Sequence, residues 1–212
     1  MHKQIAARAL LGSAVALTLC AVAGAFAAAS TPLAIDSARV TISGTSNIHA
    51  YTASTTTVRV RRGQLAGATD GGDLWANALK PGGVEMFEVT IPAATLTSPR
   101  EGLDANMHKA LQVTEHPDIV FRLLRFEPGA AGALKGIGVL KIAGVVREVA
   151  IDITTERKNA ALSVRGQVTL LMTDFGIKPP VALMGMLKTD PKVAVTFETL
   201  LMVAPIATTQ QH

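Results

Sequence analysis

The chain has 212 residues, of which 49% are hydrophobic but only 4% aromatic, and its formal net charge at pH 7 is +4. This length accommodates one domain with a sizeable core, which must be built mainly from Val, Leu, Ile, Ala and Met. The basic residues cluster only at Arg59, Arg61 and Arg62, with no aromatic residues between them for base stacking, so nucleic acid is not an expected partner.

Residues 1–29 are predicted to be a Sec-type signal peptide. Lys3 and Arg8 form a basic start, an apolar run too short for a membrane span follows, and small residues near Ala27 to Ala29 suit a cleavage site. The only cysteine, Cys20, lies in this leader. We therefore expect a periplasmic or secreted protein that has no disulfides and, after cleavage, no transmembrane segment.

Alternating apolar and polar residues predict three strands in the first half of the chain, at 39–47, 54–66 and 84–91. In the first of them, Val40 and Ile42 alternate with polar residues, a pattern typical of a strand with one buried face. The segment 68–83 is rich in Gly and is predicted to be a loop, with Trp75 tucked against the body of the protein.

One helix is predicted after the third strand. The residues at 98–101, Ser-Pro-Arg-Glu, have the order of a capping box, with Ser98 as the N-cap. Leu103, Met107 and Leu111 then recur every four residues and form one narrow apolar stripe. A short helix with a single apolar stripe is expected to pack against the sheet.

Five further strands are predicted at 119–127, 134–143, 145–154, 162–173 and 192–203. The turns between most of them are short, so neighbouring strands are expected to be antiparallel. Eight strands that are each apolar on one side can close into a barrel or stack as two sheets. We favour closure because it removes the exposed edges. The predicted fold class is all-β, an eight-stranded antiparallel β-barrel with one short helix between strands 3 and 4.

The connection between the last two strands is unusually apolar for a loop. Its apolar residues are Phe175, Ile177, Pro179, Pro180, Val181, Leu183, Met184 and Met186. Such a segment is expected to cover apolar surface, either as an adaptable lid over the lumen or as a permanent plug. An eight-stranded barrel either fills with side chains or holds one small ligand, so both alternatives stay open.

The order of several short motifs resembles the YceI-like family, also called polyisoprenoid-binding or lipid-binding proteins. The motifs lie at 36–51, at 103–111 leading into His116-Pro117-Asp118-Ile119-Val120-Phe121, at 138–144, and at Thr173-Asp174-Phe175-Gly176-Ile177. The resemblance implies a lipocalin-like barrel, here spanning 30–205, whose lumen holds a long isoprenoid or similar amphiphile in the bacterial envelope. Residues 206–212 are expected to be a disordered tail.

The expected ligand-binding residues are apolar side chains that line or cap the lumen. They are Phe87, Val89, Ile91, Met107, Leu111, Phe121, Leu140, Ile142, Ile151, Leu170, Met172, Phe175, Ile177, Leu183, Met184, Met186 and Phe197. His49 and Tyr51 are candidates for contact with a polar head group. The expected partner is an isoprenoid quinone, a polyprenyl compound or another lipid, with no further cofactor. A homodimer is left open.

No catalytic or metal-binding pattern stands out. The histidines after the leader, at positions 49, 108, 116 and 212, lack the spacing of a metal site, and no nucleophile motif is found. We therefore expect a binding protein and not an enzyme. Two alternatives remain: an envelope interaction module with a packed core and no ligand, and a hydrolase in which His49, His108 or His116 meets a carboxylate in a cleft.

Overall fold

The structure, a computed structural model, describes residues 31–66, 73–130, 133–182 and 187–204. Its elements are β1 (Thr31–Ser46), β2 (Ala50–Thr55), β3 (Arg59–Leu65), α1 (Leu74–Ala78), β4 (Val84–Pro92), the 3-10 helix η1 (Ala93–Thr95), α2 (Glu101–Ala110), β5 (Asp118–Pro128), β6 (Leu134–Ile142), β7 (Val145–Lys158), β8 (Ala161–Leu171), the 3-10 helix η3 (Met172–Phe175), β9 (Val181–Ala182) and β10 (Leu187–Val203).

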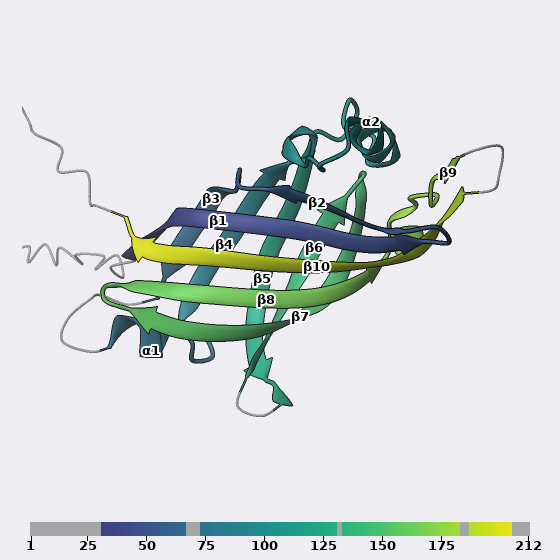
Figure 1. Ribbon diagram of the computed structural model, residues 1–212. Coiled ribbons are helices and arrows are strands. Elements are labelled where there is room, and N and C mark those ends of the chain that lie inside the picture. Colours follow the sequence, from purple (N-terminus) through teal and green to yellow (C-terminus); the bar gives the residue numbers. More distant parts are fainter. Residues whose placement is uncertain (1–30, 67–72, 131–132, 183–186, 205–212) are drawn as a thin grey trace, which may run out of the picture.

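The strands form one sheet that closes on itself (Figure 1). Its order is β2-β1-β3-β4-β5-β6-β7-β8-β10-β9, and β10 also pairs with β1 along almost the whole of both strands, from Leu33 opposite Val203 to Ser46 opposite Thr189. All of the pairings are antiparallel. Eight strands therefore make the barrel, with β2 and β9 as additions at its edge, and the predicted fold class is confirmed.

The strand predicted at 54–66 is in fact two strands. β2 pairs with the second half of β1, whereas β3 pairs with the first residues of β1, Thr31 and Pro32. The other edge of β2 is bridged by the segment after η1, since Ser54 and Thr97 exchange backbone hydrogen bonds of 2.8 and 3.0 Å. Sequence alternation does not reveal this break because threonines, which favour strands, run through it.

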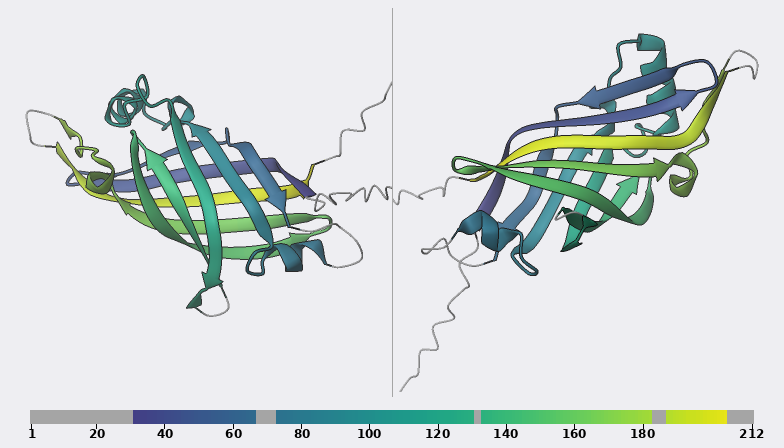
Figure 2. Two further views of the ribbon diagram at one scale, coloured as in Figure 1. Left: turned by 180° about the vertical axis from the view of Figure 1, so that it is seen from behind. Right: turned by 60° about the horizontal axis from the view of Figure 1, so that its bottom comes forward.

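The predicted loop at 68–83 contains the short helix α1. Asp73 is its N-cap, because the Asp73 carboxylate accepts hydrogen bonds from the backbone N–H groups of Trp75 and Ala76 at 3.2 and 3.3 Å. Trp75 is only 3% exposed, as expected, and its indole N–H donates to the carbonyl oxygen of Ala160 at 3.0 Å. α1 thereby covers one end of the barrel, which we call the α1 end (Figures 1 and 2).

The helix predicted after the third strand is present as α2, but the predicted capping box is wrong. α2 begins at Glu101 and has no side-chain N-cap, because the hydroxyl group of Ser98 bonds the backbone N–H and carbonyl of Arg100 instead. The carboxylate of Asp104 accepts from the backbone N–H of Ser98 at 2.8 Å. α2 lies at the opposite end of the barrel from α1, the α2 end (Figure 2).

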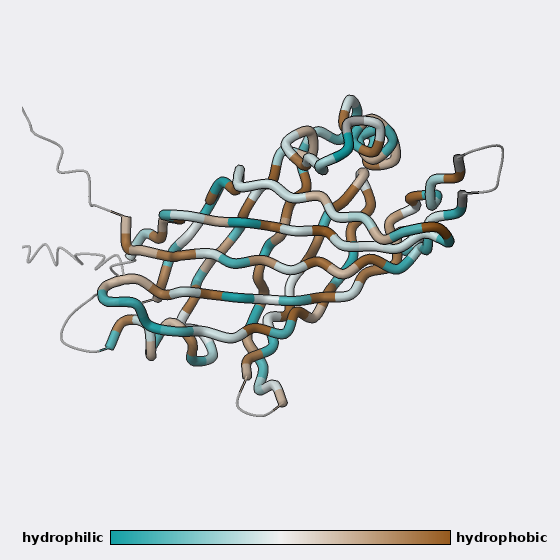
Figure 3. Tube along the Cα trace, in the orientation of Figure 1, coloured by the Kyte–Doolittle hydropathy of each residue, from teal (hydrophilic) through white to brown (hydrophobic). Residues whose placement is uncertain are grey.

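Apolar side chains alternate with polar ones along the strands, as the hydropathy colours of Figure 3 show. The buried residues divide into two clusters. One lies at the α1 end around Leu65 and Trp75, and the other, at the α2 end, includes Leu111 and Leu170. Phe175 and Ile177, from the apolar connection, are buried in this second cluster. The sites predicted at Leu183, Met184 and Met186 lie outside the described residues.

Candidate ligand-binding site

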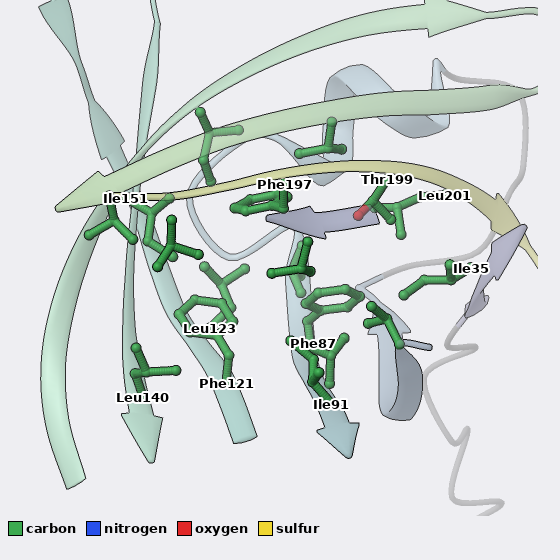
Figure 4. A pocket seen from close by; sticks show the side chains of 18 of the residues that line it. Ile35, Phe87, Ile91, Phe121, Leu123, Leu140, Ile151, Phe197, Thr199 and Leu201 are labelled. Atoms are coloured by element: carbon green, nitrogen blue, oxygen red, sulfur yellow. The ribbon is translucent and has the colours of Figure 1, made fainter. Parts of the chain in front are cut away.

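An apolar cavity of about 200 Å³ runs through the barrel interior between the two ends. All eight barrel strands contribute to its wall, and Trp75 and Leu79 close it at the α1 end. The labelled side chains of Figure 4, among them Phe87, Phe121 and Phe197, converge on it from different strands. Apart from Thr155 and Thr199, every lining residue is apolar, so the cavity suits a hydrocarbon guest.

Glycines on the inner face keep aromatic rings against the wall. Phe197 of β10 is paired with Gly166 of β8, and a Cβ atom at position 166 would overlap the Phe197 ring. Tyr51 of β2 covers Gly44 of β1 in the same way. An aromatic ring that fills the place of a missing side chain on the next strand stabilises the sheet there. The rings occupy space along the wall that other side chains would fill, and the middle of the lumen stays free.

A second apolar cavity, of about 110 Å³, adjoins the first at the α2 end. The two share several wall residues, including Ile42, Ile142 and Leu170. The remaining wall of the second cavity is supplied mainly by half-buried side chains of α2, such as Met107, by Met172 of η3 and by the apolar connection. Methionine side chains adapt readily to different shapes, so this end can accommodate ligands of different outline.

Tyr51 is the polar residue of the second cavity. Its hydroxyl group is buried and makes no hydrogen bond to any group in the described part of the chain. Burial raises the pKa of the Tyr51 phenol above its ordinary value of 10.0, and the negative charge of Asp190 raises it further. The phenol is therefore an uncharged donor at neutral pH.

His49, the other predicted head-group residue, lies elsewhere. It is exposed, it lines neither cavity, and its Nε2 atom lies 3.0 Å from Nη1 of Arg100. Since the guanidinium group only donates, His49 accepts this hydrogen bond. The structure therefore places His49 outside both cavities, and its contact with a head group stays a prediction. The reason for this position is that His49 belongs to the turn before β2 and does not follow the inward and outward alternation of the strand.

The structure places every described apolar residue of the predicted site on the wall of one cavity or both. Their contact with a ligand stays a prediction. Sequence analysis missed the walls formed by β1, including Leu33 and Ile35, because the predicted strand began at Arg39 whereas β1 begins at Thr31. It also missed Leu96, which is buried directly after η1, in a stretch without strand periodicity.

Within the described ranges, no group of three or more His, Cys, Asp or Glu residues is arranged to hold a metal ion. His108 and His116, candidates for a hydrolase, are engaged separately: the Nε2 atom of His108 bonds the Leu96 carbonyl at 2.8 Å, and the His116 ring packs against Gly144. None of the helices in the described part of the chain has the length and apolar character needed to cross a membrane.

Comparisons with known proteins agree with this architecture. The crystal structure of Burkholderia cenocepacia BcnA superimposes with a TM-score of 0.63 at 14% identity, covering 80% of this chain and 100% of that one. A polyisoprenoid binding domain from Saccharophagus degradans, described as implicated in plant cell wall breakdown, gives a TM-score of 0.60 at 10% identity, covering 82% and 99%. The TM-scores show a shared fold, and at these low identities they show the fold alone. No curated protein sequence matches this chain. The family model of the YceI-like domain matches residues 17–201, and the chain therefore belongs to the YceI-like family.

Proposed function

We propose that this protein is an exported binding protein that holds an isoprenoid chain, or the chain of a similar amphiphile, in its barrel lumen. The observation that carries the proposal is the lumen itself, whose wall is apolar on every strand apart from Thr155 and Thr199. An isoprenoid quinone or a polyprenyl compound has the long, flexible hydrocarbon chain that such a wall accommodates.

The affinity would come from burial of the chain. Each buried methylene group contributes about 0.8 kcal/mol, so a long chain binds without specific polar contacts. An apolar cavity of about 150 Å³ is already large enough to bind benzene in another protein. The main cavity here, at about 200 Å³, is larger and continues into the second one at the α2 end. The length of the ligand's hydrocarbon chain and the chemistry of its polar end would then determine selectivity.

Two comparisons support a binding role. The chain belongs to the YceI-like family, and one structural neighbour is described as a polyisoprenoid binding domain. Export is supported by the basic start, the apolar run and the small residues of 1–29. Mass spectrometry of the protein from the periplasmic or secreted fraction tests this part, and we expect a chain that begins near Ala28.

The binding proposal is tested by purifying the protein without detergent and examining an organic extract by mass spectrometry. We expect an isoprenoid or another long-chain amphiphile in near-stoichiometric amount, and uptake of the same compound by stripped protein. A lumen that yields no such compound and takes none up would contradict the proposal. That result would favour the envelope interaction module with a packed core.

A further inference from the structure

Tyr51 is the only tyrosine in the chain, and it lies on the inner face of the barrel at the α2 end. Its cross-strand partner is Gly44, and the next pair with the same orientation is Ala53 and Ile42. Ile42 belongs to the walls of both cavities, and Val193, opposite Gly44 on β10, belongs to the wall of the second. The register therefore directs the Tyr51 side chain inward, into the second cavity, which adjoins the first.

The hydroxyl group of Tyr51 stands out because nearly all buried polar atoms in proteins have a hydrogen-bond partner. This one has none among the described residues. Its position depends on Gly44, since a Cβ atom there would overlap the hydroxyl end of the ring. The sequence thus combines a glycine and a tyrosine to place an unpaired donor in an apolar cavity. An unpaired donor of this kind indicates a partner from outside the chain.

The charge near the hydroxyl group limits what that partner can be. Asp190 acts on the phenol through its negative charge, and the backbone N–H of Lys192 holds the Asp190 carboxylate with a 2.8 Å hydrogen bond. A phosphate or carboxylate group beside Tyr51 would be repelled by Asp190, although water reduces this repulsion because Asp190 is exposed. Arg100, the basic residue that precedes α2, lines neither cavity and donates a hydrogen bond to His49.

We propose that Tyr51 donates a hydrogen bond to the polar end of the ligand, and that this end is an uncharged acceptor such as a carbonyl or ester oxygen. This inference rests on the proposed function, because the apolar chain must lie in the main cavity for its polar end to reach Tyr51. It orients the ligand, with the chain pointing to Trp75 at the α1 end and the acceptor at the α2 end.

The test compares three probes with similar isoprenoid chains: farnesylacetone, which carries a ketone, farnesyl phosphate, which is anionic, and farnesene, a hydrocarbon. Their dissociation constants are measured with the intact protein and with Tyr51→Phe, which removes only the hydroxyl group. Thr52→Val is the matched control, because it removes a hydroxyl group from the adjacent, exposed position on the outer face.

For the unchanged protein and for Thr52→Val, we expect farnesylacetone to bind about five- to tenfold more tightly than farnesene, the value of one good hydrogen bond. Farnesyl phosphate should bind more weakly than farnesylacetone. In Tyr51→Phe the preference for the ketone over the hydrocarbon should disappear, while the affinity for farnesene stays the same. Asp190→Asn should reduce the difference in affinity between farnesylacetone and farnesyl phosphate.

Two results would overturn the inference and leave the proposed function intact. One is equal affinity of Tyr51→Phe and the unchanged protein for the ketone, which would point to an internal water as the partner of the hydroxyl group. The other is tighter binding of the phosphate than of the ketone. If none of the three probes binds the unchanged protein, the proposed function fails together with the inference.

Discussion

The two ends of the barrel differ in how their apolar side chains are held. At the α1 end, Trp75 is almost fully buried and is fixed by its bond to the Ala160 carbonyl, and Asp73 both caps α1 and forms an ion pair with Arg157. At the α2 end, Met107 and the other side chains from α2 on the cavity wall are mostly half-buried, and Val181 of β9 is 61% exposed.

Because of this difference, we expect the two ends to have separate roles in ligand binding. Half-buried side chains are displaced at a lower cost in free energy than buried ones, so we expect a ligand to enter and leave beside α2, although Phe175 and Ile177 at the same end are buried. At the α1 end, the buried Trp75 and its hydrogen bond to the Ala160 carbonyl keep the end of the barrel closed. An apolar chain in the lumen would therefore contact a rigid surface there. The orientation proposed for the ligand, with its polar end at Tyr51, follows the same division.

The largest expected effect is on folding at the α1 end. Trp75→Ala should lower the free energy of unfolding by about 3–5 kcal/mol, because it leaves a cavity in a fully buried cluster. Met107→Ala at the α2 end should cost only about 1 kcal/mol, since Met107 is half-buried. Urea unfolding of both variants measures the contrast. Equal losses would show that the two ends do not differ in the way we describe.

A smaller effect is expected in the middle of the lumen. Gly166→Ala should push the Phe197 ring away from the wall, with an overpacking cost of about 1–3 kcal/mol. The displaced ring would reduce the affinity for farnesylacetone by about tenfold.

Gly102→Ala is the control for this variant, because a Cβ at Gly102 of α2 meets no neighbouring atom. It should leave binding unchanged and stabilise the helix by up to about 1 kcal/mol. Unchanged ligand affinity in Gly166→Ala would argue against a binding site beside the Phe197 ring.

Tyr51 provides a spectroscopic test of the α2 end. As the only tyrosine, it is the sole source of the phenolate signal in an ultraviolet titration. Burial, and then the charge of Asp190, should place its midpoint above the ordinary tyrosine pKa of 10.0, and Asp190→Asn should lower that midpoint. A midpoint at or below 10.0 in the folded protein would mean that the hydroxyl group is solvated and that the α2 end is more open than described.

The smallest expected effect concerns Asp73 at the α1 end. The hydrogen bond from the backbone N–H of Ala76 does most to lower the pKa of the Asp73 carboxyl. Desolvation opposes it, and the charge of Arg157 and further hydrogen bonds lower the pKa again, so that the net shift is downward. The unfolded chain therefore takes up a proton on Asp73 before the folded chain does, so this stabilisation is present above the ordinary carboxyl pKa and is lost as the pH falls through the folded value.

Asp73→Asn measures this contribution. Its stability should be lower than that of the unchanged protein at pH 7, and the two should converge in acid as Asp73 becomes protonated. A stability difference that is the same at pH 7 and pH 3 would exclude the proposed ionic contribution of this cap.

Much of the barrel could be predicted from the sequence, because one-sided burial imposes a period of two that is visible in residues such as Leu162 to Leu170. The features that were missed depend on contacts between distant segments. α1 is too short to show a periodicity, and the division between β2 and β3 becomes evident only through their pairing with different parts of β1. The capping box failed because the Ser98 hydroxyl group had a closer competitor in the backbone of Arg100.

The candidate site shows the same limit. Inward apolar residues on regular strands were identifiable from alternation alone. His49 and Tyr51, two positions apart, could not be distinguished, since only the structure shows that one lies in a turn and the other in a strand. The relation of Tyr51 to Gly44, which buries the hydroxyl group, depends on the register of β1 against β2.

A crystal structure of the protein with bound farnesylacetone tests the central claim most directly. We predict electron density for the isoprenoid chain inside the barrel, between Phe121 and Phe197, with the ketone oxygen within hydrogen-bonding distance of the Tyr51 hydroxyl group. A ligand bound on the outer surface, with the lumen filled by side chains, would contradict the account.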